Sequence, residues 1–501
     1  MTLLATLARL EAASTGRAQP LSRVRHRHLS GQPLVLIPLT LAGDPATPVA
    51  AMAGTSRTAP RLLVVPQPRD RELRLRFQAG LARVVLDYIT ARQAATEVLP
   101  ATSKREERRR YADAPQILVP NRAARDYLGL LGRATRFQPT DGPYAVDPSI
   151  PVLGRWLTFL ADRADHPGSA LLTDLTTLLA EQWATGQSPL EDAHLAAQLA
   201  WIDPPPGLTG LQAALAAEDP LRCPPAGPAT DPGFDQAILE PLVRNHDRAL
   251  RDRDQPAAAR AAAEITEAVR GQLAPTWQSA WNAIALLNAL PQTASADRRW
   301  AEDRDSFTRF SLYLADGGLP QPRRDRAVPA AARLDQLERA QAAFDAQRAL
   351  EDPFVLADLR TAGEAFGGIV VSANPARTTA SATGRAILRP RFTVSTPDLV
   401  RIEPGRTLIC PARPGQRVQI TELARDGEDA TIVVLEVTQG MGTPRKPKAG
   451  AVPGIGEEVT YAPDPGYFAQ REFPPPSQTP WTHGGPPRQA RAEDPDGEAR
   501  A

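Results

Sequence analysis

A short run near the C-terminal end of the chain concentrates cations of the kind that bind phosphate. Residues 440–450 read Gly-Met-Gly-Thr-Pro-Arg-Lys-Pro-Lys-Ala-Gly, which places Arg445, Lys446 and Lys448 almost side by side. A flexible basic loop on a small β-domain is a common way to hold a phosphate backbone without reading base sequence. A solvated loop kept soluble by its charge would have the same composition. We take Arg445, Lys446 and Lys448 as the candidate nucleic-acid-binding residues.

The chain is otherwise almost free of lysine. Three of its 58 basic residues are lysines, the third being Lys104, and all the others are arginines. A P-loop needs a lysine to reach the β- and γ-phosphates, and pyridoxal enzymes and Schiff-base aldolases need a deprotonatable ε-amine. Lys104 has no glycine cradle before it, and the other two lysines share one Pro/Gly-rich loop. The sequence therefore excludes a nucleotide motor and lysine-dependent covalent catalysis, and we expect no cofactor.

A second group of cations lies near the N-terminus, where His26 and His28 are interspersed with Arg23, Arg25 and Arg27. A His-x-His pair on a strand can bind a metal. The neighbouring arginines would repel a cation, however, so we predict no metal site here. We interpret this segment as a solvated basic stretch.

Carboxylates and thiols give no stronger signal for chemistry. The acidic pair at 351–352, with Asp358 and Glu364, is compatible with a magnesium nuclease, but acidic residues at helix ends more often cap helices. Cys223 and Cys410 stand alone, whereas zinc sites need paired cysteines or histidines. The sequence also lacks a Gly-x-Ser-x-Gly elbow. We therefore assign no catalytic and no metal-binding residues.

The elements that must position these residues begin with an α/β domain over residues 1–140. Aliphatic runs bounded by proline predict buried strands at 34–41, 61–65 and 116–120. Asp70 and Asn121 are typical helix caps, so a helix should start after each of them. The alternation of strand and helix predicts parallel strands.

Ligands of such sheets bind beyond the carboxyl ends of the strands, which here are the loops 66–70 and 120–122. Arg69 and Arg122 are either anion contacts near helix N-termini or solvated arginines on a first turn. Both loops lack glycine, and proline blocks close backbone approach, so neither loop is suited to a dinucleotide or a triphosphate.

Residues 151–366 show helical periodicity, interrupted by a proline-rich joint near 203–233. Trp277 and Trp281 are four residues apart on an alanine-rich helix, a spacing typical of a core stripe rather than of base stacking. We therefore expect a helical region in the middle of the chain.

In the segment 367–466 the hydrophobic periodicity changes from that of helices to that of strands. Short β-branched runs separated by Pro-Gly and Asp-Gly turns recur every ~7–13 residues from Phe392 onward, which predicts a small antiparallel β-barrel. Val418 and Ile420 should face its core, with the residues between them facing water. Residues 467–501 are rich in proline, glycine and charge and are predicted to form a disordered tail.

Composition limits the partners. The formal net charge is +1, so contact with nucleic acid requires a local patch rather than a global field. The longest apolar run, 33–41, is under half the ~20 residues that span a bilayer, and no apolar run of signal-peptide type precedes Leu29. We expect a cytoplasmic protein with no membrane partner.

The fold class that emerges is α+β and multidomain, with an N-terminal α/β segment, a helical middle and a C-terminal small antiparallel β-barrel. The combination of barrel and helices resembles the accessory domains of helicases, although the motor motifs themselves are absent. We therefore expect a non-catalytic nucleic-acid-binding or adaptor protein, with nucleic acid, a separate helicase-like ATPase, or both as partners. Two alternatives stay open: a carboxylate/magnesium-dependent nuclease or hydrolase, and a scaffold that contacts only proteins. DNA and RNA are not distinguished.

Overall fold

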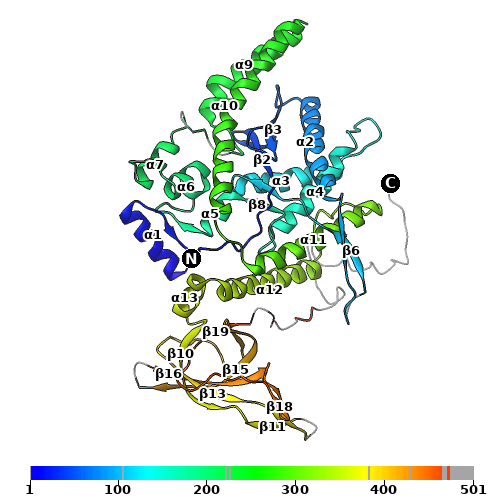
Figure 1. Cartoon of the computed structure of the whole chain (residues 1–501). Helices are drawn as coiled ribbons and strands as arrows, with labels where there is room; N and C mark the ends of the chain where they lie inside the picture. Colours follow the sequence, from blue (N-terminus) through cyan, green and yellow to red (C-terminus); the bar gives the residue numbers. More distant parts are fainter. Residues whose placement is uncertain are drawn as a thin grey trace, which may run out of the picture.

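The computed structural model shows an N-terminal mixed α/β region, a helical middle and a C-terminal β-barrel, in the order predicted (Figure 1). It describes residues 2–103, 106–220, 223–224, 227–381, 384–427, 430–464, 466 and 471–473. The predicted tail, 467–501, lies outside the described residues except for 471–473. The α+β fold class is confirmed, while the division into separate domains stays a prediction.

The N-terminal region is built on a five-stranded sheet with the order β4 (Arg61–Val64), β3 (Asp44–Gly54), β2 (Leu34–Leu41), β7 (Ile117–Val119) and β8 (Leu172–Asp174). The three predicted strands are present, and β7 pairs in parallel with both β2 and β8. The sequence analysis missed β3, which is antiparallel to both β2 and β4. Its residues are mostly alanine and proline, and only Thr47 and Val49 are β-branched, so its β-strand signal is weak.

Side chains of the central strands alternate between two hydrophobic cores, one on each face of the sheet. Leu34 and Leu36 face one core, and Val35 and Ile37 face the other. Both faces are covered by helices, which explains why β2 reads as a continuous apolar run. The sheet is therefore the middle layer of three.

The first core lies beneath α2 (Arg71–Arg92), α3 (Arg122–Thr135), α4 (Ser149–Ala164) and α11 (Ala294–Ala315). The predicted caps are confirmed: Asp70 accepts from the Leu73 amide at 2.8 Å, and Asn121 accepts from the Ala124 amide at 3.0 Å. These caps fix where α2 and α3 start at the carboxyl ends of β4 and β7.

The second core lies beneath α5 (Leu175–Ala180), α6 (Leu195–Ile202) and α10 (Gln255–Asn288). Trp277 belongs to this core, is 2% exposed and donates its indole N–H to the Arg57 carbonyl at 2.9 Å, which confirms the core interpretation of the tryptophan stripe. The apolar run at 171–179 was expected to be helical throughout. Instead Leu172–Asp174 form the edge strand β8, and the helix starts only at Leu175.

The remaining elements connect and flank these layers. The helices are α1 (Leu3–Thr15), η1 (Glu191–Ala193), α7 (Gly210–Ala217), α8 (Pro232–Phe234), η2 (Asp235–Leu239), α9 (Glu240–Arg251), α12 (Ala327–Glu351) and α13 (Pro353–Ala362). Two small antiparallel pairs are formed by β1 (Gln19–Pro20) with β9 (Trp183–Ala184) and by β5 (Thr96–Leu99) with β6 (Arg108–Tyr111). Within the described ranges, no helix is both long and apolar enough to cross a bilayer.

The C-terminal region is a closed antiparallel barrel, which in the described part of the chain has six strands. Their order is β10 (Phe366–Asn374), β13 (Arg391–Thr396), β16 (Ala430–Gln439), β15 (Arg413–Asp426), β14 (Thr407–Cys410) and β19 (Glu458–Pro463), with β19 pairing back to β10. Val418 and Ile420 are buried in its core, as predicted. The core also holds Phe366 and Phe392, whose rings both pack against the ring of Tyr461.

One end of the barrel faces the rest of the molecule and the other projects away from it. Helix α12 packs beside β19, and α13 leads directly into β10 (Figure 1). At the opposite end lie two small hairpins, β11 (Thr378–Ala380) with β12 (Ala386–Leu388) and β17 (Gly442–Thr443) with β18 (Lys446–Pro447). This projecting end is where the candidate residues lie.

Candidate functional site

The three candidate cations lie on or beside the β17–β18 hairpin. Arg445, Lys446 and Lys448 are exposed, and none of them forms an ion pair with another described residue. The turn is fixed by its backbone: the Lys446 amide donates to the Thr443 hydroxyl at 3.1 Å, and the Lys448 amide donates to the Met441 carbonyl at 2.9 Å. The hairpin thus presents three cations to solvent from an ordered turn.

The turn requires glycine at position 442. Its φ is +83°, in the left-handed region that favours glycine, and a Cβ there would lie 2.5 Å from the Lys446 carbonyl oxygen. The glycine therefore permits the tight approach of the two short strands.

A second hairpin lies beside the first and adds arginines that the sequence analysis did not assign to the site. Strand β12 contacts β17, and Figure 1 places β11 and β18 next to each other at the projecting end. The hairpin β11–β12 and its flanks carry Arg377, Arg385 and Arg389. We call these three residues, together with Arg391, Arg445, Lys446 and Lys448, the basic end of the barrel.

The basic end holds more cations than nearby carboxylates. Arg377, Arg389 and Arg391 all approach Glu436, at 2.7, 4.0 and 3.7 Å. Arg391 also approaches Glu422, at 3.7 Å, but Glu422 is largely exposed. One partly buried carboxylate thus serves three guanidiniums, which leaves a surplus of positive charge.

The arginines of this cluster are held in place by backbone carbonyls. Arg377 donates to the Arg389 carbonyl at 2.8 Å, and Arg389 donates to the Thr438 carbonyl at 2.8 Å. Each keeps part of its side chain exposed. No local sequence signal marks them, because the pairing of β13 with β16 brings Arg391 opposite Glu436, 45 residues later in the chain.

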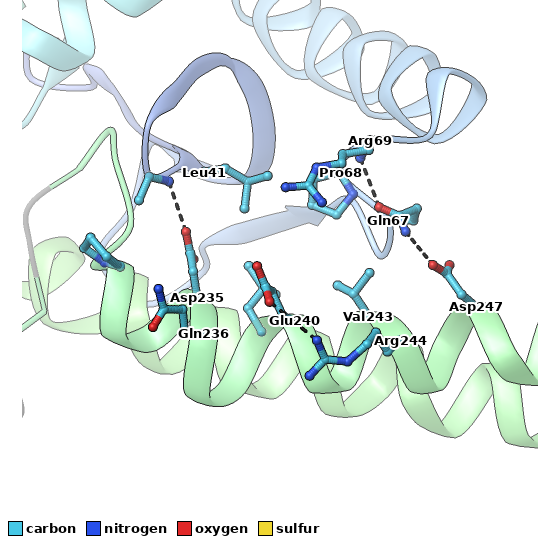
Figure 2. Close-up of a pocket in the computed structure, with 13 residues that line it drawn as sticks. Leu41, Gln67, Pro68, Arg69, Asp235, Gln236, Glu240, Val243, Arg244 and Asp247 are labelled. Carbon is cyan, nitrogen blue, oxygen red and sulfur yellow. Dashed lines mark hydrogen bonds and ion pairs between the residues drawn. The ribbon is translucent and has the colours of Figure 1, made fainter.

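The loops at the carboxyl ends of the sheet strands form a separate pocket (Figure 2). It has a volume of about 380 Å³ and lies between the β4–α2 loop and α9. Arg69 points into it and makes no ion pair within the described ranges. Asp235, Glu240 and Asp247 also line the pocket, and among the described residues Arg244 is the one other cation in its lining. Carboxylates therefore outnumber guanidiniums there, and an anion would gain little net attraction.

Arg122, the other loop arginine, does not line this pocket. It is exposed on the first turn of α3 and lies 3.9 Å from Asp126, one turn along the same helix. The structure thus separates Arg69 and Arg122 rather than bringing them together.

The N-terminal basic cluster is not solvated, and that interpretation is wrong for four of its five members. His26 is 1% exposed and bonds Asp352 at 3.1 Å, and Arg27 bonds Glu181 at 3.0 Å. Arg25 donates to the Leu290 carbonyl at 3.1 Å. Only Arg23 is exposed. The segment packs against helices more than 150 residues later in the chain, which local composition does not reveal.

His28 completes this buried segment. Its ring stacks on Trp300 with a centroid distance of 4.2 Å. Burial lowers the pKa of His28 to about 4, because the surroundings disfavour the charged imidazolium. This histidine is therefore neutral at pH 7.

The acidic residues considered for magnesium binding have other partners. Glu351 accepts from the Ser295 amide at 2.8 Å. Asp352 caps α13 by accepting from the Phe354 amide at 3.0 Å, besides bonding His26. Among the described residues, no group of three or more histidine, cysteine or acidic side chains is arranged to hold a metal ion. Cys223 and Cys410 are both free thiols.

The chain matches no family model, no curated protein and no solved structure. We therefore infer function from the residues of this chain alone.

Proposed function

We propose that this protein is a non-catalytic factor that binds the phosphate backbone of nucleic acid with the basic end of its barrel. The observation that carries the proposal is that Arg445, Lys446 and Lys448 are exposed and pair with no described carboxylate, beside three arginines that share the partly buried Glu436. Ordered cations projecting from a small barrel are suited to phosphate contacts that do not select sequence.

The position of the basic end also supports this proposal. It lies away from the helices, so a strand of nucleic acid can reach it without passing over the rest of the molecule (Figure 1). The overall charge is close to neutral, so attraction for polyanions has to be local. A helicase-like ATPase supplied by a separate chain stays part of this proposal as a partner, because the lysines that a motor needs are missing.

The first test removes the hairpin cations. We expect the triple variant Arg445→Ala, Lys446→Ala, Lys448→Ala to bind a fluorescein-labelled 20-nucleotide single strand at least tenfold more weakly at low salt. Because each neutralised phosphate releases a counterion, the slope of log K against log salt should become shallower by about 2. Fluorescence anisotropy over a salt series, with DNA and RNA strands in parallel, measures both quantities.

The matched control removes three exposed arginines from the far end of the molecule, Arg248, Arg251 and Arg260 on α9 and α10. This variant has the same loss of net charge and should bind as the unmodified chain does. Equal weakening by both variants would mean that overall charge, not the basic end, drives binding. Degradation of the labelled strand in Mg²⁺ or Mn²⁺ would instead favour the nuclease alternative.

A further inference from the structure

Helix α1 exposes an apolar surface to solvent. Leu7 and Leu10 are 50% and 62% exposed, and Leu4 beside them is only partly buried. Within α1 only Ala12 is buried. Isolated exposed leucines are ordinary, but here they are neighbours on one helix and line a common groove.

The opposite wall of the groove is α13, which is equally uncovered. No residue of α13 is buried, and its Phe354, Val355 and Leu359 line the same groove as the α1 leucines. The groove has a volume of about 1230 Å³. Two helices with apolar side chains facing a shared hollow form the kind of surface that receives a third helix.

The charges around this groove are mainly negative. Glu11 on α1, and Asp358 and Glu364 at α13, line it without an ion pair to any described residue. Arg23 also lines it, with its guanidinium 5.5 Å from the centre of the Phe354 ring, and Arg348 lies 3.9 Å from Asp345. The unpaired charges therefore attract a cationic ligand.

We propose that the α1–α13 groove binds an amphipathic α-helix of a partner protein, whose apolar stripe is flanked by arginine or lysine. The apolar stripe would cover Leu7, Leu10 and Phe354, and the flanking cations would face Glu11, Asp358 and Glu364. Charge complementarity selects this occupant over an acidic helix, which the three unpaired carboxylates repel. The proposal is independent of the nucleic-acid function, because the groove and the basic end lie on different parts of the molecule (Figure 1).

The test uses the full chain and two synthetic 20-residue helical peptides labelled with fluorescein. One carries leucine at i, i+3, i+4 and i+7 positions flanked by lysine and arginine, and the other has glutamate at the flanking positions. We expect the basic peptide to bind with micromolar affinity and the acidic peptide to bind at least tenfold more weakly. Binding of neither peptide, or of both equally, overturns the proposal.

Variants then locate the binding surface. Leu7→Asn with Leu10→Asn should weaken the basic peptide at least tenfold, while the control pair Leu190→Asn with Leu319→Asn, at positions 85% and 77% exposed, should leave it unchanged. Because changes in α1 could loosen that helix, the second variant Asp358→Lys with Glu364→Lys alters the other wall. It should reverse the preference toward the acidic peptide, and an unchanged preference overturns the proposal.

Two other occupants give distinct results. If a second copy of the chain fills the groove, light scattering shows a dimer that Leu7→Asn with Leu10→Asn dissociates. If a lipid surface covers the groove, the unmodified chain binds phosphatidylcholine vesicles, and the variant Leu7→Asn with Leu10→Asn does not. Either result overturns the partner-helix proposal.

Discussion

The chain contains two clusters of arginine that look alike in sequence and differ completely in the folded protein. In the segment Arg23–His28, the arginines and histidines alternate, and most of them are enclosed by carbonyls, carboxylates and aromatic rings. At the basic end of the barrel, three cations pair with no carboxylate among the described residues, and three more share Glu436. A cluster of cations therefore indicates a binding surface only when the fold leaves it without partners.

The largest expected effect comes from removing Asp352, the carboxylate that bonds His26 in the buried cluster. Asp352→Ala would leave His26 buried without its partner and would remove the cap of α13. We expect the free energy of unfolding to fall by about 4 kcal/mol, since losing one partner of a buried polar pair costs ~3–5 kcal/mol. Urea unfolding followed by circular dichroism measures this loss.

The control for that variant is Asp316→Ala, an exposed position at the end of α11. We expect a change below about 0.5 kcal/mol there. A similar small change at Asp352 would show that the buried cluster does not depend on its carboxylate, and the contrast with the barrel would disappear.

Acidification should affect the buried cluster through His28. Its pKa is lowered to about 4 in the folded protein, against about 6.5 when unfolded, so only the unfolded chain takes up the proton between these values. Above pH 6.5 this histidine leaves the stability unchanged, and as the pH falls from 6.5 to 4 the free energy of unfolding decreases by about 3 kcal/mol in total.

Unfolding measured between pH 7 and pH 4 checks this expectation, together with an NMR titration of the His28 ring. In His28→Gln, whose side chain does not titrate, this part of the pH dependence should vanish. A folded-state pKa near 6.5 in the titration would contradict the burial that distinguishes this cluster from the barrel's.

The smallest expected effect comes from a single substitution at the basic end of the barrel. Glu436→Gln removes the one carboxylate shared by Arg377, Arg389 and Arg391. Because the pairs are partly exposed, stability should fall by only about 1 kcal/mol. Affinity for a single strand should rise about two- to fivefold at low salt, since one repelling charge is gone.

Anisotropy on the labelled strand measures this gain. The exposed Glu422, which lies near Arg391 alone, provides the matched variant Glu422→Gln, and its effect should be smaller. Weaker binding in Glu436→Gln would mean that the carboxylate's positioning of the arginines outweighs its charge.

Local patterns were sufficient to predict much of the architecture. Asp70 and Asn121 marked helix starts because a cap is a contact between near neighbours in sequence. Val418 and Ile420 revealed the inner face of a strand because a half-buried strand alternates. Strand β3 was missed because it consists mainly of small residues buried between two helical layers, which show no alternation and include few β-branched side chains.

The sites were predicted less well because they depend on contacts between distant segments. The hairpin cations could be proposed from sequence because they are adjacent in the chain, whereas Arg377 and Arg389 join them only through the pairing of β13 with β16 and the contact of β12 with β17. His26 was misjudged because its partner, Asp352, lies more than three hundred residues away. Composition showed where charges gather along the chain, and the fold decides which of them remain unpaired.

The pairing of β19 with β10 has a consequence for how the barrel can meet other molecules. Because the last strand of the cylinder returns to its first, each of its six described strands has a paired neighbour on both sides. An extended peptide therefore finds no unpaired edge strand on the cylinder itself, whereas the two-stranded sheets β11–β12 and β17–β18 keep outer edges. A partner that docks on the wall of the cylinder therefore contacts mainly its side chains.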